Sequence, residues 1–277
     1  MSTKILSLKE ACASGFKYGL IGHPINQSLS PTLFNSKFGD GYAAIDLDGE
    51  DIVAALAQLH SAGFLGLNVT APYKGAVCYV TNRNTGRSKV TLSCSTLVSV
   101  SGGWQAYDLD GISLLLIMKK HNPNLLREPV LVVGTGSAAA SIVEALVSRG
   151  NRHVFVVGRN MDDAGVICRY MNRKACSDSL MKLFRRGHAS SDWGYGKTIK
   201  AIINATPVGW NPEDTFPYDV LTSGAEVVFD LTYPMVPNFL ARSCRQHGIP
   251  YHDGAEMVAE VARCSWKLWG LTDSKDE

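Results

Sequence analysis

A short segment near residue 70 ends in a lysine placed where proton chemistry could occur. The run Gly66-Leu-Asn-Val-Thr-Ala-Pro-Tyr-Lys74 begins as a predicted strand over Leu67–Ala71, and Pro72 must end it because proline cannot donate to a strand ladder. Lys74 then follows at a junction between a strand and a helix, where catalytic groups collect in α/β proteins. The alternative interpretation is an exposed lysine that opens a helix.

Two polar residues of the same strand favour the catalytic interpretation. Asn68 and Thr70 point to one face because side chains alternate along a strand. A buried strand would normally place apolar side chains there. An amide and a hydroxyl on one face indicate a wall that binds a hydroxylated ligand.

Asp110 is the predicted partner of Lys74. It lies in the segment Asp108-Leu-Asp110-Gly111, which follows a predicted hairpin with a turn at Gly102-Gly103. An aspartate before a glycine is often only a turn former. A lysine in a cleft, however, needs a carboxylate to hold it, and a coupled pair has shifted pKa values suited to proton transfer near neutral pH.

A glycine-rich loop predicts a dinucleotide site in the second half of the chain. The apolar run Pro129–Val133 is typical of a buried parallel strand, and it is followed by Gly134-Thr-Gly136-Ser-Ala-Ala139. A helical stretch, Ser141–Arg149, and a second strand, Val154–Val157, come next. This order of strand, loop, helix and strand is the context in which such a loop binds a dinucleotide.

The predicted cofactor is NADP, with NAD as the second choice. Gly134 and Gly136 let the backbone approach a pyrophosphate, and the N-terminus of the following helix attracts it. Ser137 and Ala138, in the same loop, are further candidate cofactor contacts. Arg159 follows the second strand, where an arginine suits a 2′-phosphate. Arg159 could instead be a solvated surface residue.

Residues 66–74 closely resemble the G-x-N-V-T-x-P-x-K signature of shikimate dehydrogenases, and the resemblance extends from about residue 17 to 270. Gly22–Pro31 resembles the family's G-x-P-I-x-H-S-x-S-P, whose two serines hold the substrate carboxylate. The resemblance therefore implies substrate contacts by Ser28 and Ser30. Ser30, directly before Pro31, could instead cap a helix.

The resemblance implies further roles. Lys74 and Asp110 take the positions of the catalytic pair, and Ser95 takes that of an asparagine that contacts a substrate hydroxyl. Tyr233 falls where the family often has a tyrosine near the nicotinamide. The implied cofactor contacts, beyond those named above, are Asn204, Thr206 and Gly254.

The chain departs from the family pattern on the substrate side. Gln27 stands where the family usually has histidine, Ser95 where it has asparagine, and Val261 where it has a substrate-binding glutamine. Phe34 also replaces a frequent histidine. A site built to bond a hydroxyl rejects ligands that lack it, so these changes imply an altered preference or weaker binding.

Composition bounds the class of protein. The chain has 277 residues, 45% of them hydrophobic, and a net charge of +2, which gives no reason to expect nucleic-acid or membrane binding. Its seven cysteines show no C-x-x-C pair or histidine cluster, so we expect a reducing compartment, the cytoplasm, and no metal site.

The predicted fold class is α/β with two domains. We expect a substrate-binding catalytic domain over 1–111, completed by a C-terminal helix in 253–277, and a doubly wound, Rossmann-type NADP domain over 112–252. We expect a monomer or a homodimer.

The resemblance implies an NADP-dependent dehydrogenase that interconverts shikimate and 3-dehydroshikimate in the shikimate pathway of aromatic amino acid biosynthesis. A quinate or related hydroxy-cyclohexane-carboxylate dehydrogenase is the first alternative, in line with the changed residues. The second is a metabolite-binding regulator with weak catalysis, against which the pair Lys74 and Asp110 speaks.

Overall fold

The chain forms two compact units in a computed structural model. The structure describes residues 4–81, 83–158, 182–184 (backbone only), 199–211, 213–215 and 224–271. One unit comprises Met1–Asp110 with Val258–Glu277, and the other comprises Gly111–Met257. The first division lies one residue before the predicted boundary, and the second lies five residues after it.

The first unit is built on a seven-stranded sheet of order β1-β3-β2-β4-β6-β7-β5. Its strands are β1 (Ile5–Leu6), β2 (Tyr18–Gly22), β3 (Tyr42–Asp46), β4 (Gly66–Val69), β5 (Arg83–Asn84), β6 (Thr96–Val100) and β7 (Gly103–Tyr107). Its helices before residue 110 are α1 (Leu8–Ala13), α2 (Ser30–Phe38), α3 (Ile52–Ser61), α4 (Lys74–Val80) and α5 (Gly86–Thr91). Strands β2, β3 and β4 run parallel, so their carboxyl ends meet at one edge.

The C-terminal part of α10 (Gly254–Leu268) and the residues after it complete this unit. The Trp269 indole donates to the Leu97 carbonyl over 3.0 Å and stacks on Tyr18. A Cβ at Gly66 would lie 2.2 Å from Nε1 of Trp269. The first glycine of the segment 66–74 is therefore required by packing, because any side chain would displace the tryptophan.

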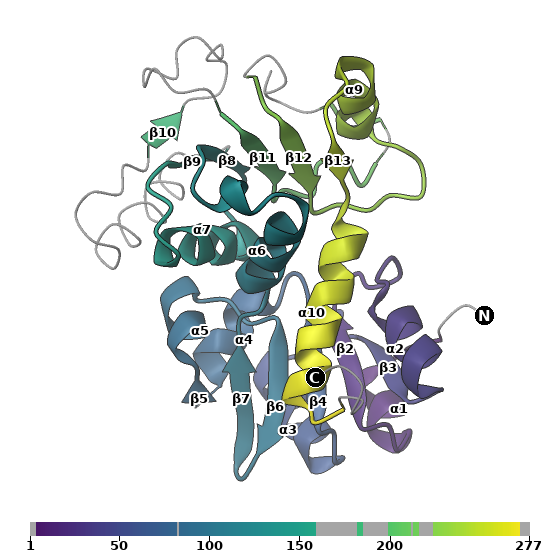
Figure 1. Cartoon of the computed structure of the whole chain (residues 1–277). Coiled ribbons are helices and arrows are strands. Elements are labelled where there is room, and N and C mark those ends of the chain that lie inside the picture. Colours follow the sequence, from purple (N-terminus) through teal and green to yellow (C-terminus); the bar gives the residue numbers. More distant parts are fainter. Residues whose placement is uncertain are drawn as a thin grey trace. The chain divides into compact units, whose positions relative to one another are not determined.

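The second unit has a six-stranded parallel sheet of order β10-β9-β8-β11-β12-β13, which is 3-2-1-4-5-6 in chain order (Figure 1). The strands are β8 (Val130–Val133), β9 (Val154–Val157), β10 (Lys182–Phe184), β11 (Ala201–Asn204), β12 (Val227–Asp230) and β13 (Tyr251–His252). The helices in the described part of this unit, before α10, are α6 (Asp110–His121), η1 (Pro123–Leu126), α7 (Ser137–Ser148) and α9 (Phe239–His247). This strand order is that of the Rossmann fold and confirms the predicted fold class.

Several local predictions need correction. The predicted strand over Leu67–Ala71 ends at Val69, and helix α7 begins at Ser137, four residues before the predicted helix. The short elements β1, α1, β5 and α5 were not predicted, because two-residue strands and six-residue helices carry too little periodicity.

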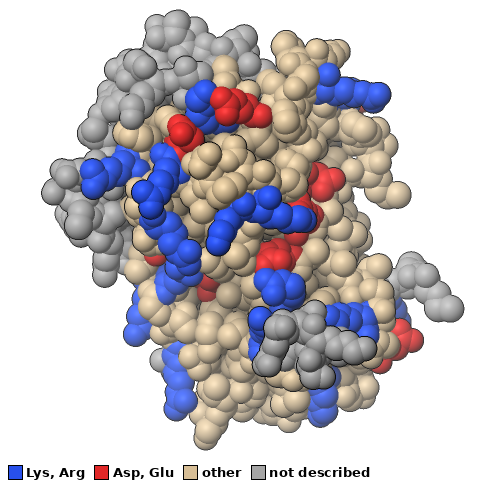
Figure 2. All heavy atoms as spheres, in the orientation of Figure 1, with Lys and Arg blue, Asp and Glu red and all other residues tan. Residues whose placement is uncertain are grey.

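None of the helices in the described part of the chain is long and apolar enough to cross a membrane. On the face shown in Figure 2, basic side chains lie at many separate places, with acidic side chains between several of them. This distribution accords with the net charge of +2.

Candidate functional site

Lys74 and Asp110 meet within the first unit. Lys74 is the first residue of α4 and Asp110 the first of α6. The Lys74 Nζ donates to Asp110 Oδ2 over 2.6 Å. The lysine side chain is 20% exposed and the aspartate side chain 3%. The pair is therefore largely withdrawn from water, with only the lysine reachable by a ligand.

The pKa of Lys74 is raised above its ordinary value of 10.5. Burial by itself would lower this pKa, but the charge of Asp110, its hydrogen bond and the charge of Asp108 together outweigh burial. The expected shift toward neutral pH is therefore wrong in direction for Lys74. The pair rests as an ammonium beside a carboxylate, which suits proton donation and the stabilisation of a negative oxygen.

The loop that carries Asp110 is tied to the strand opposite it. The Ser95 hydroxyl accepts from the Leu109 N–H over 2.9 Å, and the Cys94 N–H donates to the Lys74 carbonyl over 3.0 Å. Ser95 is only 2% exposed. These contacts favour a positioning role for Ser95, which differs from the predicted substrate contact.

Asp108 is a second buried carboxylate that the sequence reasoning did not name as a site residue. It is 3% exposed and accepts a hydrogen bond from the Thr91 hydroxyl over 2.6 Å. Its charge also contributes to the raised pKa of Lys74. The spacing of the two aspartates around Leu109 was the available signal.

Asn68 lies in a buried hydrogen-bond network. Its carboxamide oxygen accepts from the Tyr42 hydroxyl over 2.7 Å, and its amide nitrogen donates to Ser265 Oγ over 2.8 Å and Thr96 Oγ1 over 3.2 Å. Asn68 is 5% exposed. These bonds engage both ends of the amide within the protein, so they favour a structural role for Asn68 over the predicted substrate contact.

Thr70 lies just after β4 and is half-buried. Its N–H donates to the Ile21 carbonyl over 3.0 Å, which places it beside the end of β2. A Cβ at Gly22 would lie 2.3 Å from Thr70 Cγ2, so the absent side chain of Gly22 makes room for the threonine. No hydrogen bond ties the Thr70 hydroxyl to another residue in the described part of the chain, so the hydroxyl is available to a ligand.

At the start of α2 it is Ser28, rather than Ser30, whose side chain bonds to the backbone. Ser30 is the first helical residue rather than the N-cap, which is Leu29, and the Leu29 side chain makes no capping bond. Ser28 Oγ instead accepts from the Ser30 N–H over 3.3 Å. Both serines are half-buried at the start of the helix. The proposed capping role of the Ser30 hydroxyl is wrong, because the helix begins one residue earlier than expected.

His23 is a further residue at this edge that the sequence reasoning did not select. Its ring Nδ1 lies 2.8 Å from Asp46 Oδ1, and its backbone N–H donates to the Ala71 carbonyl over 3.0 Å. The hydrogen bond to Asp46 is the main cause that raises the pKa of His23 above 6.5. His23 and Thr70 therefore both border the carboxyl edge of β2, β3 and β4.

The glycine-rich loop of the second unit has the geometry of a phosphate cradle. Gly134 has φ of +127°, and a Cβ there would lie 2.7 Å from the Ala205 carbonyl oxygen. Gly136, the N-cap of α7, is exposed, and a Cβ there would meet nothing within 4 Å. The first amides of α7, from Ser137 and Ala138 onward, have no acceptor inside the helix, so they can bind an anion.

Asn204 and Thr206 shape the neighbouring turn. Asn204 is fully buried, donates to Asp230 Oδ1 over 2.9 Å and accepts from the Thr206 hydroxyl over 2.6 Å. Both side chains therefore hold the loop that packs against Gly134. Arg159 lies outside the described residues.

Tyr233 and Gly254 lie beyond the ends of β12 and β13. The Tyr233 ring contacts the Trp210 ring edge-on, with centroids 4.5 Å apart. Gly254 opens α10, donates to the Thr232 carbonyl over 2.9 Å and has no room for a side chain beside Leu231. Gly254 is thus required by packing at this junction.

Two family models match the chain. Residues 20–97 match a model described as "Shikimate dehydrogenase substrate binding domain". Residues 116–189 match a model described as "Shikimate / quinate 5-dehydrogenase". The first match includes Lys74, and the second includes the glycine-rich loop.

Curated relatives match almost the whole chain. A protein of Xanthomonas oryzae pv. oryzae named shikimate dehydrogenase (NADP(+)) is 30% identical over 266 residues, which cover 91% of this chain and 90% of the relative. A protein of the same name from Symbiobacterium thermophilum is 27% identical over 259 residues, covering 91% and 87%.

A solved structure has the same fold. It is the shikimate 5-dehydrogenase of Thermus thermophilus in complex with NADP(H) and shikimate, with a TM-score of 0.76 and 22% identity over 92% of this chain and 93% of that one. At this identity the likeness concerns the fold alone.

Proposed function

Because the chain belongs to the shikimate dehydrogenase family of oxidoreductases, we propose that it interconverts shikimate and 3-dehydroshikimate with NADP as the cofactor. The observation that carries this proposal is the ion pair between Lys74 and Asp110, which is largely withdrawn from water. A protein that only binds a metabolite has no evident need for such a pair.

The residues of the first unit manage the proton. In the reductive direction the Lys74 ammonium donates a hydrogen bond and then a proton to the ketone oxygen, while Asp110 holds the lysine in place. In the oxidative direction Lys74 must first lose its proton before it can accept one from the substrate hydroxyl. When bound, NADP supplies the hydride acceptor or donor.

The substrate contacts that we retain are Thr70, Ser28 and Ser30. The Thr70 hydroxyl suits a ring hydroxyl, and the two serines lie at the start of α2, where the helix dipole favours a carboxylate. Tyr233 remains a proposed contact in the second unit. Ser95 and Asn68 are left out because their polar atoms are engaged within the protein.

The second unit has residues that fit NADP. A Cβ at Gly134 would fill the cradle beside Ala205, and the free amides of α7 face a position that can take a pyrophosphate. The curated relatives are named as NADP(+) enzymes. Arg159 is the proposed contact to the 2′-phosphate, and its role rests on sequence position alone.

Quinate, or a related hydroxylated cyclohexane carboxylate, is the second candidate substrate. Ser95 is shorter than the asparagine that it replaces and is turned to Leu109, and Val261 has no polar group. Both changes remove hydrogen bonds to substrate hydroxyls, which alters the preference among related acids.

The test is absorbance-monitored reduction of NADP and of NAD, each with shikimate and with quinate. We expect the fastest reduction for NADP with shikimate. Lys74→Ala should lower turnover by about 10²-fold or more in a protein that still folds, because it removes the proton donor. Its melting temperature should fall, because the buried Asp110 carboxylate loses its partner. The matched control is Lys9→Ala on the exposed face of α1, which should retain full turnover.

Each other result has a definite meaning. Faster turnover with quinate would make quinate the substrate in place of shikimate, and faster turnover with NAD would make NAD the cofactor in place of NADP. The proposed role of Lys74 would be the same in both cases. Binding of shikimate without reduction of either cofactor would favour a metabolite-binding regulator. Full activity of the Lys74→Ala variant would remove Lys74 from the mechanism.

A further inference from the structure

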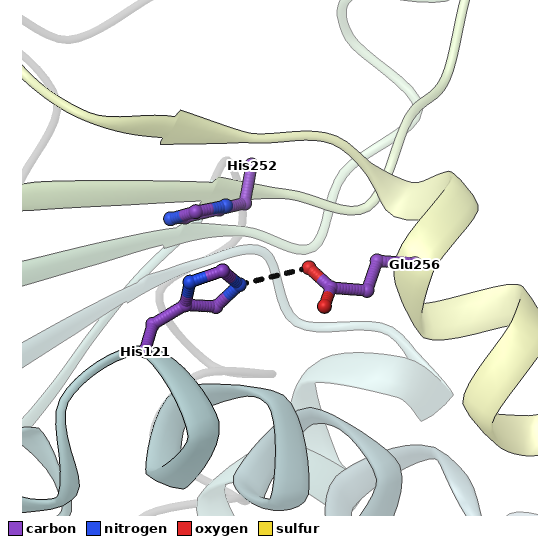
Figure 3. A group of neighbouring side chains, drawn as sticks. All are labelled: His121, His252 and Glu256. Carbon is purple, nitrogen blue, oxygen red and sulfur yellow. Dashed lines mark hydrogen bonds and ion pairs between the residues drawn. The ribbon is translucent and has the colours of Figure 1, made fainter.

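A cluster of three side chains in the second unit has no part in the proposed reaction. His121 ends α6, His252 ends β13, and Glu256 lies in the first turn of α10 (Figure 3). Each offers one ligand atom, and these atoms lie within 4.8 Å of one another. The sequence predicts no metal site, because it contains no cluster of closely spaced cysteine and histidine ligands. His121 lies 131 positions before His252 in the chain, so only the fold brings the two histidines together.

The contacts within the cluster bring nitrogen and oxygen atoms to one point. The His121 Nε2 lies 2.9 Å from Glu256 Oε2. The His121 and His252 rings lie with their centroids 3.7 Å apart and their planes tilted by 33°. Figure 3 shows the His121 ring directed at the carboxylate, with the His252 ring over it.

Packing holds the cluster in this arrangement. The His252 ring stacks on Phe229 of β12, with centroids 5.2 Å apart and planes at 22°. His252 is thus held between Phe229 and His121. His121 stands at the C-terminus of α6, where the helix dipole favours a cation.

Lys120 leaves one carboxylate oxygen for an ion. Its Nζ lies 2.7 Å from Glu256 Oε1, while Oε2 faces His121. Carboxylates that bind metals are commonly held by such an outer hydrogen bond on the other oxygen. The lysine charge repels a cation, so we expect it to weaken the affinity without blocking the site.

We propose that His121, His252 and Glu256 form a binding site for one divalent transition-metal ion of the zinc class. Two imidazoles and one carboxylate suit Zn²⁺, Co²⁺ or Ni²⁺, whereas Mg²⁺ and Ca²⁺ prefer oxygen ligands alone. Three protein ligands leave a fourth position for water.

The required movement is small. Zinc ligands lie roughly 2.0 to 2.2 Å from the ion, which brings ligand atoms to roughly 3.4 Å from one another in a tetrahedron. The widest separation in the cluster, up to 4.8 Å, must therefore close by about 1.4 Å, and the 2.9 Å between His121 Nε2 and Glu256 Oε2 must open by about 0.5 Å. The side chains of His121 and Glu256, each 30% exposed, can supply this movement.

The site would join two helices that carry the chain from one unit into the other. The unit boundaries fall between Asp110 and Gly111 in α6 and between Met257 and Val258 in α10. An ion bound by His121 and Glu256 would link the last turn of α6 to the first turn of α10. The proposed role is therefore structural.

The test is titration of the purified, reduced protein with Co²⁺, followed by its ligand-field absorption, and with Zn²⁺ by calorimetry. We expect one equivalent to bind without a thiolate charge-transfer band, which separates this site from the cysteines. His121→Gln and Glu256→Gln should each weaken binding at least tenfold. The matched control is His247→Gln on α9, which should bind as the unmodified protein does.

Melting temperatures measured with and without zinc distinguish the loss of a metal ligand from a folding defect. Zinc should raise the melting temperature of the unmodified protein and of His247→Gln, but not that of His121→Gln, whose melting temperature without metal should be unchanged. The proposal is overturned by absence of saturable binding, by a thiolate band, or by binding that His121→Gln and Glu256→Gln leave intact. None of these outcomes depends on turnover of shikimate.

Discussion

At the scale of single residues, the charge state of Lys74 governs the proposed chemistry. Asp110 and Asp108 together raise the lysine pKa against the effect of burial. In the proposed reaction Lys74 therefore holds its proton at neutral pH and releases it to a developing negative oxygen. A lysine whose pKa was lowered would instead be neutral near pH 7, and two experiments distinguish a raised from a lowered pKa.

The first is the substitution Asp110→Asn. It removes the main charge that raises the Lys74 pKa, so burial should then lower that pKa. We expect turnover to fall by about 10²-fold or more, and the pH at which oxidation is fastest to move downward. Steady-state kinetics across pH measures both effects. Asp40→Asn, at an exposed position, is the control and should change neither.

The second is the pH dependence of the unmodified protein in both directions. A raised pKa keeps Lys74 protonated through neutral pH, so the unprotonated fraction needed for oxidation grows as pH rises. We therefore expect kcat/KM for shikimate oxidation to increase with pH, and kcat/KM for ketone reduction to stay level until the lysine begins to lose its proton. An oxidation profile that levels off near neutral pH would point to another base.

At the scale of elements, the loop between β8 and α7 separates packing from ligand binding. Gly134 has φ of +127° and would press a side chain into the Ala205 carbonyl, whereas Gly136 faces open space. One glycine is therefore required by the fold. The other is available to the cofactor.

Two alanine substitutions test this separation. Gly134→Ala should lower the melting temperature, because it adds strain at a left-handed φ and a close contact. Gly136→Ala should leave the melting temperature unchanged and weaken NADP binding by about tenfold or more, since a methyl group would enter the space where a pyrophosphate approaches. Melting curves and NADP titration measure the two effects. Unchanged NADP affinity in the Gly136→Ala protein would place the pyrophosphate elsewhere.

At the scale of the whole molecule, the two units differ in continuity. The second unit is one uninterrupted stretch, Gly111–Met257, while the first needs Val258–Glu277 as well. Ser265 bonds to Asn68, and Trp269 bonds to the Leu97 carbonyl. The C-terminal segment therefore supplies part of the core and of the buried polar network of the first unit.

This difference predicts how fragments behave. The fragment 111–257 should unfold cooperatively and bind NADP, because its sheet and glycine-rich loop are complete. The fragment 1–110 should not fold stably, since Asn68 and Gly66 would lose Ser265 and Trp269. Circular dichroism on melting, together with NADP titration, is the measurement. A cooperative transition in the fragment 1–110 would show that the C-terminal segment is dispensable.

The sequence by itself determined the fold class and indicated the candidate catalytic residues. Long apolar runs such as Pro129–Val133, followed by a glycine-rich loop, predict a parallel nucleotide-binding sheet because the pattern is local and strong. The spacing around Lys74 and the position of Asp110 likewise predicted that these two residues form a pair, which the structure contains. Local sequence order is sufficient for these features.

Only the tertiary structure decided what each polar side chain does. Asn68 turns to Tyr42 and Ser265, and Ser95 turns to Leu109, although both were predicted to face the substrate. The raised pKa of Lys74 likewise depends on two carboxylates brought beside it by the fold. Hydrogen-bond partners and charges far away in sequence leave no periodic signal, so their effect appears only once the chain is folded.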